Sequence, residues 1–235
     1  MPRQSKPKPD KKSIASVVGS LLATPGIKDL VGQYFATPIP DRPSSRNFAG
    51  YRFDSLPDNP RHQVVASDLV AVSLLDVTFR PEAVDALLMK GEINTELVAL
   101  PEKVNLWEAR ECIDDLYVAY GKLKKLHDVG PTKASKLLAR KRPKLAPITD
   151  RHVENVFGCS GWEFIVPLAD CFAERADLVR SLGDLKPAQP EDVVGPSTLR
   201  LLDVAIWMTQ SRAESAQDAR ELALGCRDAV KFREG

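Results

Sequence analysis

The amino-acid sequence predicts an all-α fold, a multi-helix orthogonal bundle. Apolar residues recur at spacings of three and four in one segment after another, which is the period of an amphipathic helix. Nowhere do four or more residues alternate between apolar and polar types with the β-branched enrichment of a strand. The 235 residues, 43% of them hydrophobic and 28% charged, have the composition of a globular chain that buries a substantial core.

The N-terminal quarter predicts an arm, two helices and a loop. Residues 1–12 hold five basic residues and three prolines, so we expect a disordered basic arm. Helical periodicity begins at Ser13 and predicts helices over 14–22 and 27–35, separated by Pro25-Gly26. Residues 37–62, with five prolines, are expected to form a loop. Its aromatic residues are expected to pack onto the body of the protein; these are Phe48, Tyr51 and Phe53.

The rest of the chain is expected to be helical, so that residues 13–235 form a single domain. The segment 199–208 is strongly apolar apart from Arg200 and Asp203, which predicts a core helix with one satisfied polar pair. Trp162 and Trp207 are interpreted as core residues. The predicted helices span residues 64–77, 81–90, 106–125, 131–142, 151–157, 164–174, 177–182, 197–211 and 214–232.

Positive charge is concentrated in one segment of a chain whose formal net charge is only +1. Residues 120–152 contain ten Lys or Arg residues but only two acidic residues, Asp128 and Asp150. Such a stripe is typical of a surface that contacts phosphates, although a solvated charged helix gives the same pattern. We expect Lys136, Arg140 and Lys141 to lie on the solvent-facing side of their helix.

The centre of this basic segment has the pattern of two helices joined by a tight turn. In Leu126-His-Asp-Val-Gly-Pro-Thr-Lys-Ala134, Gly130 supplies a flexible turn position and Pro131 suits the first turn of a helix. The free N–H groups at the start of that helix are suited to bind a phosphate. We therefore predict a DNA-binding surface composed of Val129, Gly130, Thr132, Lys133, Lys136, Arg140 and Lys141.

Two motifs in this region resemble the helix-hairpin-helix DNA glycosylase superfamily, whose fold is endonuclease III-like. Residues 126–134 resemble its L-P-G-V-G-x-x-x-A hairpin, and residues 146–153, APITDRHV, resemble its P-V-x-D-T-H-V segment. In this pattern the catalytic aspartate lies eighteen residues after the position of Thr132, which is Asp150. The likeness covers about residues 116–156, and the whole chain also resembles an uncharacterised bacterial domain family. The resemblance implies a central helix-hairpin-helix motif, DNA as the partner and Asp150 as the catalytic residue.

The sequence departs from the superfamily pattern at two positions. Asp128 stands where the first hairpin glycine is expected. Aspartate tolerates a left-handed backbone better than most residues, but its carboxylate repels a phosphate. Thr132 stands where members that also cleave the strand carry a lysine, so the resemblance implies a glycosylase without lyase activity.

Asp150 also has a structural interpretation, because it directly precedes a predicted helix and is suited to be its N-cap. The two roles are compatible, since a helix N-terminus favours the ionised carboxylate. In glycosidic-bond cleavage, a carboxylate stabilises an oxocarbenium-like sugar or activates water against it. We interpret His152 as structural.

The sequence therefore predicts a monofunctional DNA glycosylase that removes a damaged or modified base, as in base-excision repair. Two alternatives remain open: a non-catalytic helix-hairpin-helix DNA-binding module, and a protein-interaction domain with a basic face. The spacings of Cys112, Cys159, Cys171 and Cys226 fit neither a metal site nor an iron–sulfur cluster, so we expect no metal and no cofactor. No segment approaches the roughly 20 apolar residues of a membrane span. We expect a cytoplasmic monomer.

Overall fold

The computed structural model describes residues 8–36, 48–187 and 195–224, and within these ranges the protein is all-α, with no strand. The short α-helix at Pro81–Val84 continues directly into a turn of π-helix at Asp85–Met89. Three short 3₁₀ helices accompany the α-helices, at Ala49–Arg52, Leu106–Glu108 and Arg110–Cys112. The α-helices are α1 Lys11–Leu22, α2 Ile27–Phe35, α3 Ala66–Ser73, α4 Pro81–Val84, α5 Asn94–Ala99, α6 Ile113–Lys125, α7 Pro131–Lys141, α8 Arg151–Phe157, α9 Ile165–Glu174, α10 Ala176–Gly183, α11 Thr198–Gln210 and α12 Glu214–Ala223.

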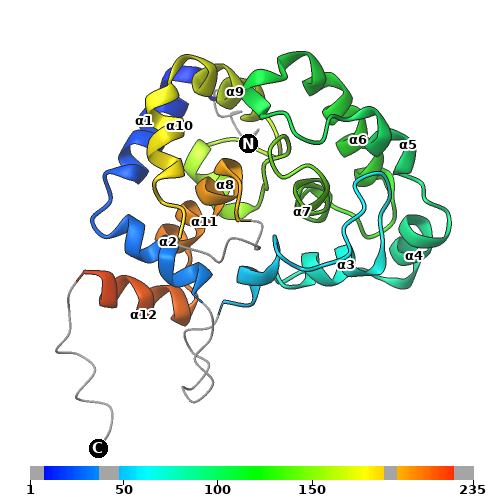
Figure 1. Cartoon of the computed structure of the whole chain (residues 1–235), viewed down its shortest axis with the longest axis horizontal. Coiled ribbons are helices and arrows are strands. Elements are labelled where there is room, and N and C mark those ends of the chain that lie inside the picture. Colours follow the sequence, from blue (N-terminus) through cyan, green and yellow to red (C-terminus); the bar gives the residue numbers. More distant parts are fainter. Residues whose placement is uncertain (1–7, 37–47, 188–194, 225–235) are drawn as a thin grey trace, which may run out of the picture.

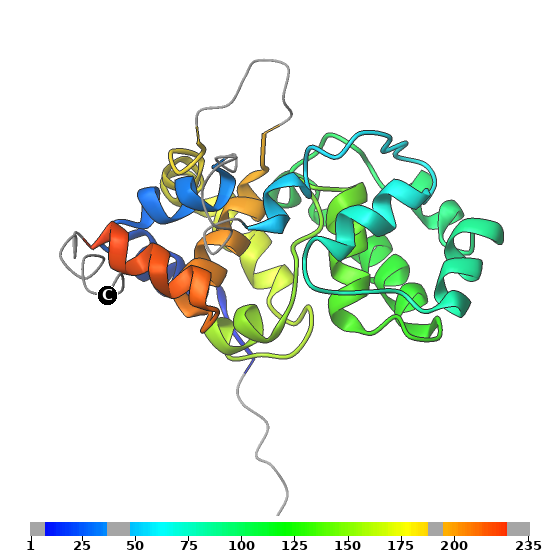
Figure 2. The same ribbon diagram turned by 90° about the horizontal axis from the view of Figure 1, so that it is seen from below.

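The helices are arranged in two halves that lie side by side (Figure 1, Figure 2). One half contains α3 to α7, and the other combines α1 and α2 with α8 to α12. The 3₁₀ helix at Leu106–Glu108 packs against α9, where the rings of Trp107 and Phe172 meet edge to face at 5.5 Å. A single cluster of buried apolar side chains runs through both halves, so the two share one core.

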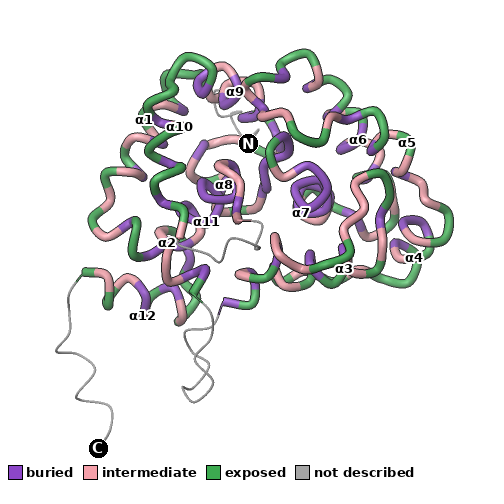
Figure 3. The backbone as a smooth tube through the Cα atoms, viewed as in Figure 1, coloured by how far each residue is buried: buried purple, intermediate pink, exposed green. Residues whose placement is uncertain are grey.

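The two most deeply buried helices are α7 and α11 (Figure 3). Every residue of α7 from Ala134 onward is buried, and so are nine of the thirteen residues of α11. The expected core helix at 199–208 is confirmed, together with its polar pair, because Arg200 Nη1 donates to Asp203 Oδ2. Trp162 is a core residue as expected, whereas Trp207 is only half-buried.

The first helix begins earlier than the sequence predicts. Helix α1 begins at Lys11, because Asp10 caps it by accepting a hydrogen bond from the Ser13 N–H at 2.8 Å. Lys11 also pairs with Glu174 of α9 at 2.5 Å. Residues 10–12 are therefore ordered, and residues 1–7 lie outside the described part of the chain.

Three other predicted segments differ from the structure. The helix expected over 106–125 is interrupted by two 3₁₀ turns, and only Ile113–Lys125 is α-helical. The helix expected over 64–77 is confined to Ala66–Ser73, and that over 214–232 is described only as far as Ala223. In the loop expected over 37–62, residues 37–47 lie outside the described ranges. The expected packing of Phe48 and Phe53 is confirmed, since both are buried.

Within the described ranges, no single helix has the length and apolar composition to cross a membrane. The adjacent helices α1 and α2 have that length and composition only when they are taken together, and an 81° bend separates them.

Candidate functional site

The turn between α6 and α7 places an aspartate, not a glycine, in the left-handed conformation. Asp128 has φ 65°, whereas Gly130 has φ −77° and ψ −179° and is the N-cap of α7. The prediction that Gly130 supplies the flexible position is wrong, because any residue adopts this extended backbone. A Cβ added at Gly130 would meet no atom within 4 Å. The expected tolerance of aspartate for the left-handed region is confirmed.

The Asp128 carboxylate is neutralised by its neighbours. It accepts hydrogen bonds from Lys133 Nζ at 2.6 Å and from the Arg80 backbone N–H at 2.9 Å. These two hydrogen bonds lower the pKa of Asp128, with the larger effect from Lys133. The charge of Lys133 is thus already paired inside the turn. Thr132 is half-buried, Val129 is buried, and the start of α7 has no side-chain cap.

Three of the residues predicted to contact DNA lie in the protein interior. Lys136, Arg140 and Lys141 are only 7%, 3% and 0% exposed. The prediction that they face solvent is wrong, because protein surrounds α7 on its basic side as well as on its apolar side (Figure 3). These side chains are therefore unavailable to DNA phosphates in this structure.

The cations at the C-terminal end of α7 are bound by Asp68 of α3. Asp68, itself buried, pairs with Arg140 Nε at 3.3 Å and with Lys141 Nζ. Lys141 Nζ also donates to Asn59 Oδ1 at 2.9 Å, and the other donors reach main-chain carbonyl groups, such as that of Phe53 from Arg140 at 2.9 Å and that of Pro60 from Lys141 at 2.8 Å. This cluster attaches the segment before α3 to the central helix, which is a structural role.

Six of the ten basic residues between positions 120 and 152 are paired or buried. Lys122 pairs with Glu96 at 2.7 Å, and the buried Arg142 donates to main-chain carbonyl groups such as that of Leu100 at 3.0 Å. The other four of these six are Lys133, Lys136, Arg140 and Lys141. The exposed basic residues of this segment are Lys124, Lys125, Lys144 and Arg151.

Asp150 is the N-cap of α8, as the sequence predicts. Its Oδ1 accepts hydrogen bonds from the N–H groups of His152 at 2.8 Å and Val153 at 3.1 Å. Its Oδ2 accepts no hydrogen bond from the described residues. The carboxylate is thus fixed by one oxygen and free at the other.

The segment that leads into Asp150 is anchored on both sides. The Thr149 N–H donates to Ser135 Oγ of α7 at 3.0 Å, and Ser135 Oγ donates to the Thr149 carbonyl at 3.1 Å. Thr149 Oγ1 donates to the Gly161 carbonyl, and Trp162 Nε1 donates to the Pro147 carbonyl, each at 3.0 Å. These contacts hold the Asp150 backbone rigidly between the two halves of the molecule.

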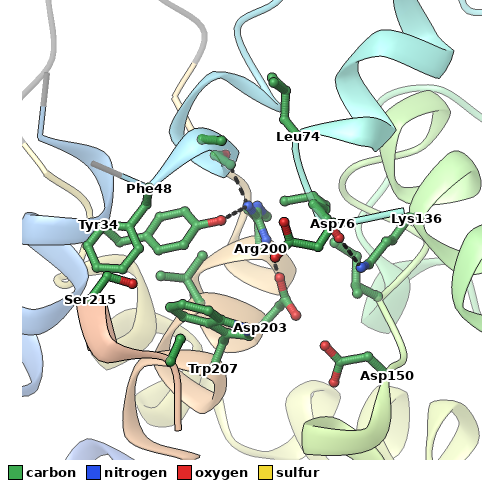
Figure 4. Close-up of a pocket in the computed structure, with 16 residues that line it drawn as sticks. Tyr34, Phe48, Leu74, Asp76, Lys136, Asp150, Arg200, Asp203, Trp207 and Ser215 are labelled. Atoms are coloured by element: carbon green, nitrogen blue, oxygen red, sulfur yellow. Dashed lines mark hydrogen bonds and ion pairs between the residues drawn. The ribbon is translucent and has the colours of Figure 1, made fainter. Parts of the chain in front are cut away.

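Asp150 lines a cavity of about 260 Å³ between the two halves (Figure 4). The cavity combines an aromatic wall with charged side chains. The rings of Tyr34 and Phe48 stack at 5.2 Å, and Trp207 meets both edge to face. The charged residues that line it are Asp76, Lys136, Asp150, Arg200 and Asp203. Its volume is slightly below the roughly 300–1,000 Å³ of drug-sized ligand sites, so it suits a single small ring system.

Lys136 extends from α7 to this cavity instead of to solvent (Figure 4). Its Nζ donates to the Leu75 carbonyl at 2.6 Å and forms no ion pair with the described residues. Burial lowers the pKa of Lys136, against the opposing effects of Asp203 and Asp150. Lys136 is thus a desolvated cation with donor capacity still open towards the cavity.

Arg200 and Asp203 of α11 form the back of the cavity. Arg200 Nη2 donates to Tyr34 Oη at 2.8 Å and to the Gly50 carbonyl at 3.2 Å, and Nε lies 3.3 Å from Asp54 Oδ2. Burial raises the pKa of Asp203 to about 6, although the Arg200 charge opposes this effect. Burial likewise raises the pKa of Tyr34 to about 12. A carboxyl group with a raised pKa in a cavity is typical of a functional site.

The sequence pattern drew attention to Asp150 but did not indicate that Arg200, Asp203 and Trp207 line the same cavity. Arg200 and Asp203 were interpreted only as a polar pair in a core helix, and Trp207 only as a core residue. The spacing of three and four residues between Arg200, Asp203 and Trp207 places them on one face of α11, and this is the only sign in the sequence that they lie together. The other residues of the candidate site come from α2, α7 and the N-cap of α8. No group of three or more metal-ligating side chains occurs in the part of the chain that the structure describes.

Comparison with known proteins places the chain in an uncharacterised family. Residues 27–210 match a family of unknown function, DUF6308, and because the match covers most of the chain, the protein belongs to that family. No curated protein and no solved structure matches the sequence. Fourteen of the sixteen residues that line the cavity lie within the matched range.

Proposed function

We propose that this DUF6308 protein is a DNA glycosylase without lyase activity, which hydrolyses the N-glycosidic bond of a damaged or modified base in its central cavity. The observation that supports the proposal most directly is how the two carboxylate oxygens of Asp150 are hydrogen-bonded. One of its oxygens caps α8 while the other is free on the wall of a cavity lined by aromatic rings. The resemblance of residues 126–153 to the helix-hairpin-helix glycosylases supports the same assignment.

The proposed reaction uses Asp150 as a fixed anion. A base in a duplex is inaccessible, so the enzyme flips it out at a cost of a few kcal/mol. As the bond between the sugar and the base breaks, positive charge develops on the sugar. A carboxylate held by the helix N-terminus stabilises that charge or activates the attacking water. The size of the cavity is consistent with one ring system.

The proposed DNA contact is smaller than the sequence predicts. The uncapped start of α7, near Thr132 and Lys133, retains N–H groups suited to one phosphate. Around it, charge is available from the exposed basic residues of the segment, which are Lys124, Lys125, Lys144 and Arg151. Affinity for DNA is therefore expected to be modest and weakly dependent on sequence.

The test is base release by the purified protein from duplexes that each carry one damaged or modified base, with detection by mass spectrometry. We expect release from at least one duplex and an abasic product that breaks only after alkali or heat. Borohydride-trapped strand cleavage would contradict the monofunctional reaction and direct attention to the Lys136 amine, which lines the same cavity. Binding without release from any duplex would instead favour a non-catalytic DNA-binding module.

A further inference from the structure

Asp203 presents an unused acceptor to the cavity. Its Oδ2 is paired with Arg200 Nη1, while its Oδ1 accepts no hydrogen bond from the described residues. The side chain is only 9% exposed, and it lines the cavity. Figure 4 shows its carboxyl group directed towards the space that Asp150 and Lys136 also face. Among the described side-chain atoms only Tyr120 Oη is both buried and without a partner, so Asp203 Oδ1 is open to the cavity, where it can accept a hydrogen bond from a ligand.

The charged groups around the cavity favour a ligand with hydrogen-bond donors. Three of them are carboxylates, those of Asp76, Asp150 and Asp203, and two are cations, Lys136 and Arg200. The guanidinium of Arg200 is engaged by Tyr34, the Gly50 carbonyl and its two carboxylate partners. Free acceptor oxygens therefore outnumber free donors among these charged groups.

The aromatic wall favours a flat ligand beside these acceptors. Trp207 lies one helical turn after Asp203 on α11, and both side chains line the cavity. The Tyr34 and Phe48 rings complete the wall, with Trp207 at 6.0 Å and 5.7 Å from them. A planar heterocycle packed there places its edge towards the carboxylates.

We infer that the cavity selects a nucleobase whose edge carries an amino group, with Asp203 Oδ1 accepting the amino hydrogen bond. This inference rests on the proposed function, because it takes the cavity as the base pocket. It adds a specificity-determining residue, Asp203, and a ligand class: amino-bearing bases such as adenine and cytosine, in preference to carbonyl-bearing counterparts such as hypoxanthine and uracil.

The experiment is binding of free bases to the full chain by isothermal titration calorimetry or ligand-observed NMR at pH 7.5. Adenine with hypoxanthine, and cytosine with uracil, form matched pairs in which the amino group is replaced by a carbonyl group and the adjacent ring nitrogen changes from an acceptor to an N–H donor. We expect each amino base to bind at least about tenfold more tightly than its partner, the usual effect of one well-made polar contact. Because no bond is cleaved, the result does not depend on catalysis.

Two variants identify the acceptor. Asp203→Asn presents an amide and is expected to abolish or reverse the preference for the amino base. Trp207→Ala removes part of the wall and is expected to weaken adenine and hypoxanthine alike, leaving their ratio unchanged; it also serves if Asp203→Asn fails to fold. Asp184→Asn, at an exposed position after α10, is the matched control and should behave as wild type.

The outcomes separate this inference from the proposed function. Equal or stronger binding of hypoxanthine and uracil, a preference that survives Asp203→Asn, or no binding of any base would overturn the inference. Base release from duplexes would stand as a separate result in each case. Selective binding of adenine and cytosine with no release from any duplex would support the inference and count against the glycosylase reaction.

Discussion

The middle and the C-terminal end of α7 carry buried cations in contrasting situations. At its C-terminal end, Arg140 and Lys141 are enclosed with Asp68, and their donors are used by that carboxylate and by main-chain carbonyl groups. One turn earlier, Lys136 has one carbonyl partner and faces a cavity in which Asp150 and Asp203 each keep a free oxygen.

The contrast distinguishes charged side chains that stabilise the fold, such as Arg140 and Lys141, from a charged side chain, Lys136, that has hydrogen-bonding capacity left for a ligand. A buried ion pair whose donors and acceptors are all hydrogen-bonded stabilises one arrangement of the chain. Removing either partner leaves the other charge buried without a counter-charge. A buried group with open hydrogen-bonding capacity adds little to stability but is ready to bind. The middle and the C-terminal end of α7 should therefore respond differently to the same kind of substitution.

The largest effect on stability is expected from Asp68→Ala. This change leaves Arg140 and Lys141 buried without their carboxylate, so we expect a loss of about 3–5 kcal/mol in the free energy of unfolding. Urea denaturation measures it. The matched control is Asp85→Ala, which breaks an exposed ion pair with Lys90 and should change stability little. Equal losses in the two variants would show that the Asp68 cluster does not hold the fold.

Two lysine-to-methionine variants compare the middle and the C-terminal end of α7 directly. Lys141→Met leaves Asp68 with one cation and should cost roughly 3 kcal/mol. Lys136→Met removes one hydrogen bond to Leu75 but also removes a buried charge, so we expect a change within about 1 kcal/mol. Denaturation midpoints at a constant m-value provide the comparison. A greater loss for Lys136→Met than for Lys141→Met would contradict the roles assigned to these two lysines.

The salt dependence of DNA binding measures how much of the basic segment is available. Six phosphate contacts would lower the affinity by roughly 10³ between 50 and 200 mM salt, whereas contacts from the four exposed residues alone would lower it by roughly 10². We expect the smaller change. A thousandfold change would mean that buried cations of α7 become exposed on DNA. Salt-independent binding, or no binding at low salt, would contradict the DNA assignment.

The smallest effect is expected at the turn before α7. Gly130→Ala should change stability by no more than about 0.5 kcal/mol, because the backbone there is extended and the added Cβ has open space. Asp128→Ala should be more harmful, since alanine is strained at φ 65° and the contacts to Lys133 and Arg80 are lost. Thermal melts would show the order of the two variants, and the reverse order would contradict this description of the turn.

The contribution of Asp128 should also depend on pH. Its pKa is lowered in the folded protein, so its carboxylate stabilises the fold above the ordinary aspartate pKa of about 4 and stops doing so as the pH falls below that value. The difference between wild type and Asp128→Ala should therefore shrink in acid.

The sequence predicted helices better than it predicted their surroundings. The period of residues 131–141 identifies a helix, but polarity alone indicated that Arg140 and Lys141 face solvent. Their partner Asp68 lies more than 70 positions away in the chain, and no local pattern connects them. The capping role of Asp150 was predictable because capping is local. The cavity was not, since it requires Lys136, Asp150 and Asp203 to meet from three helices.

The most direct test of the account is base release by Asp150→Asn, compared with wild type on a duplex that the wild type processes. Asparagine still accepts the capping hydrogen bonds, so the melting temperature and DNA affinity should be nearly unchanged. The variant lacks the free anionic oxygen at the cavity, so release should fall by at least about 100-fold. Release that persists at the wild-type rate in the folded variant would contradict the claim that the open oxygen of Asp150 is the reactive group.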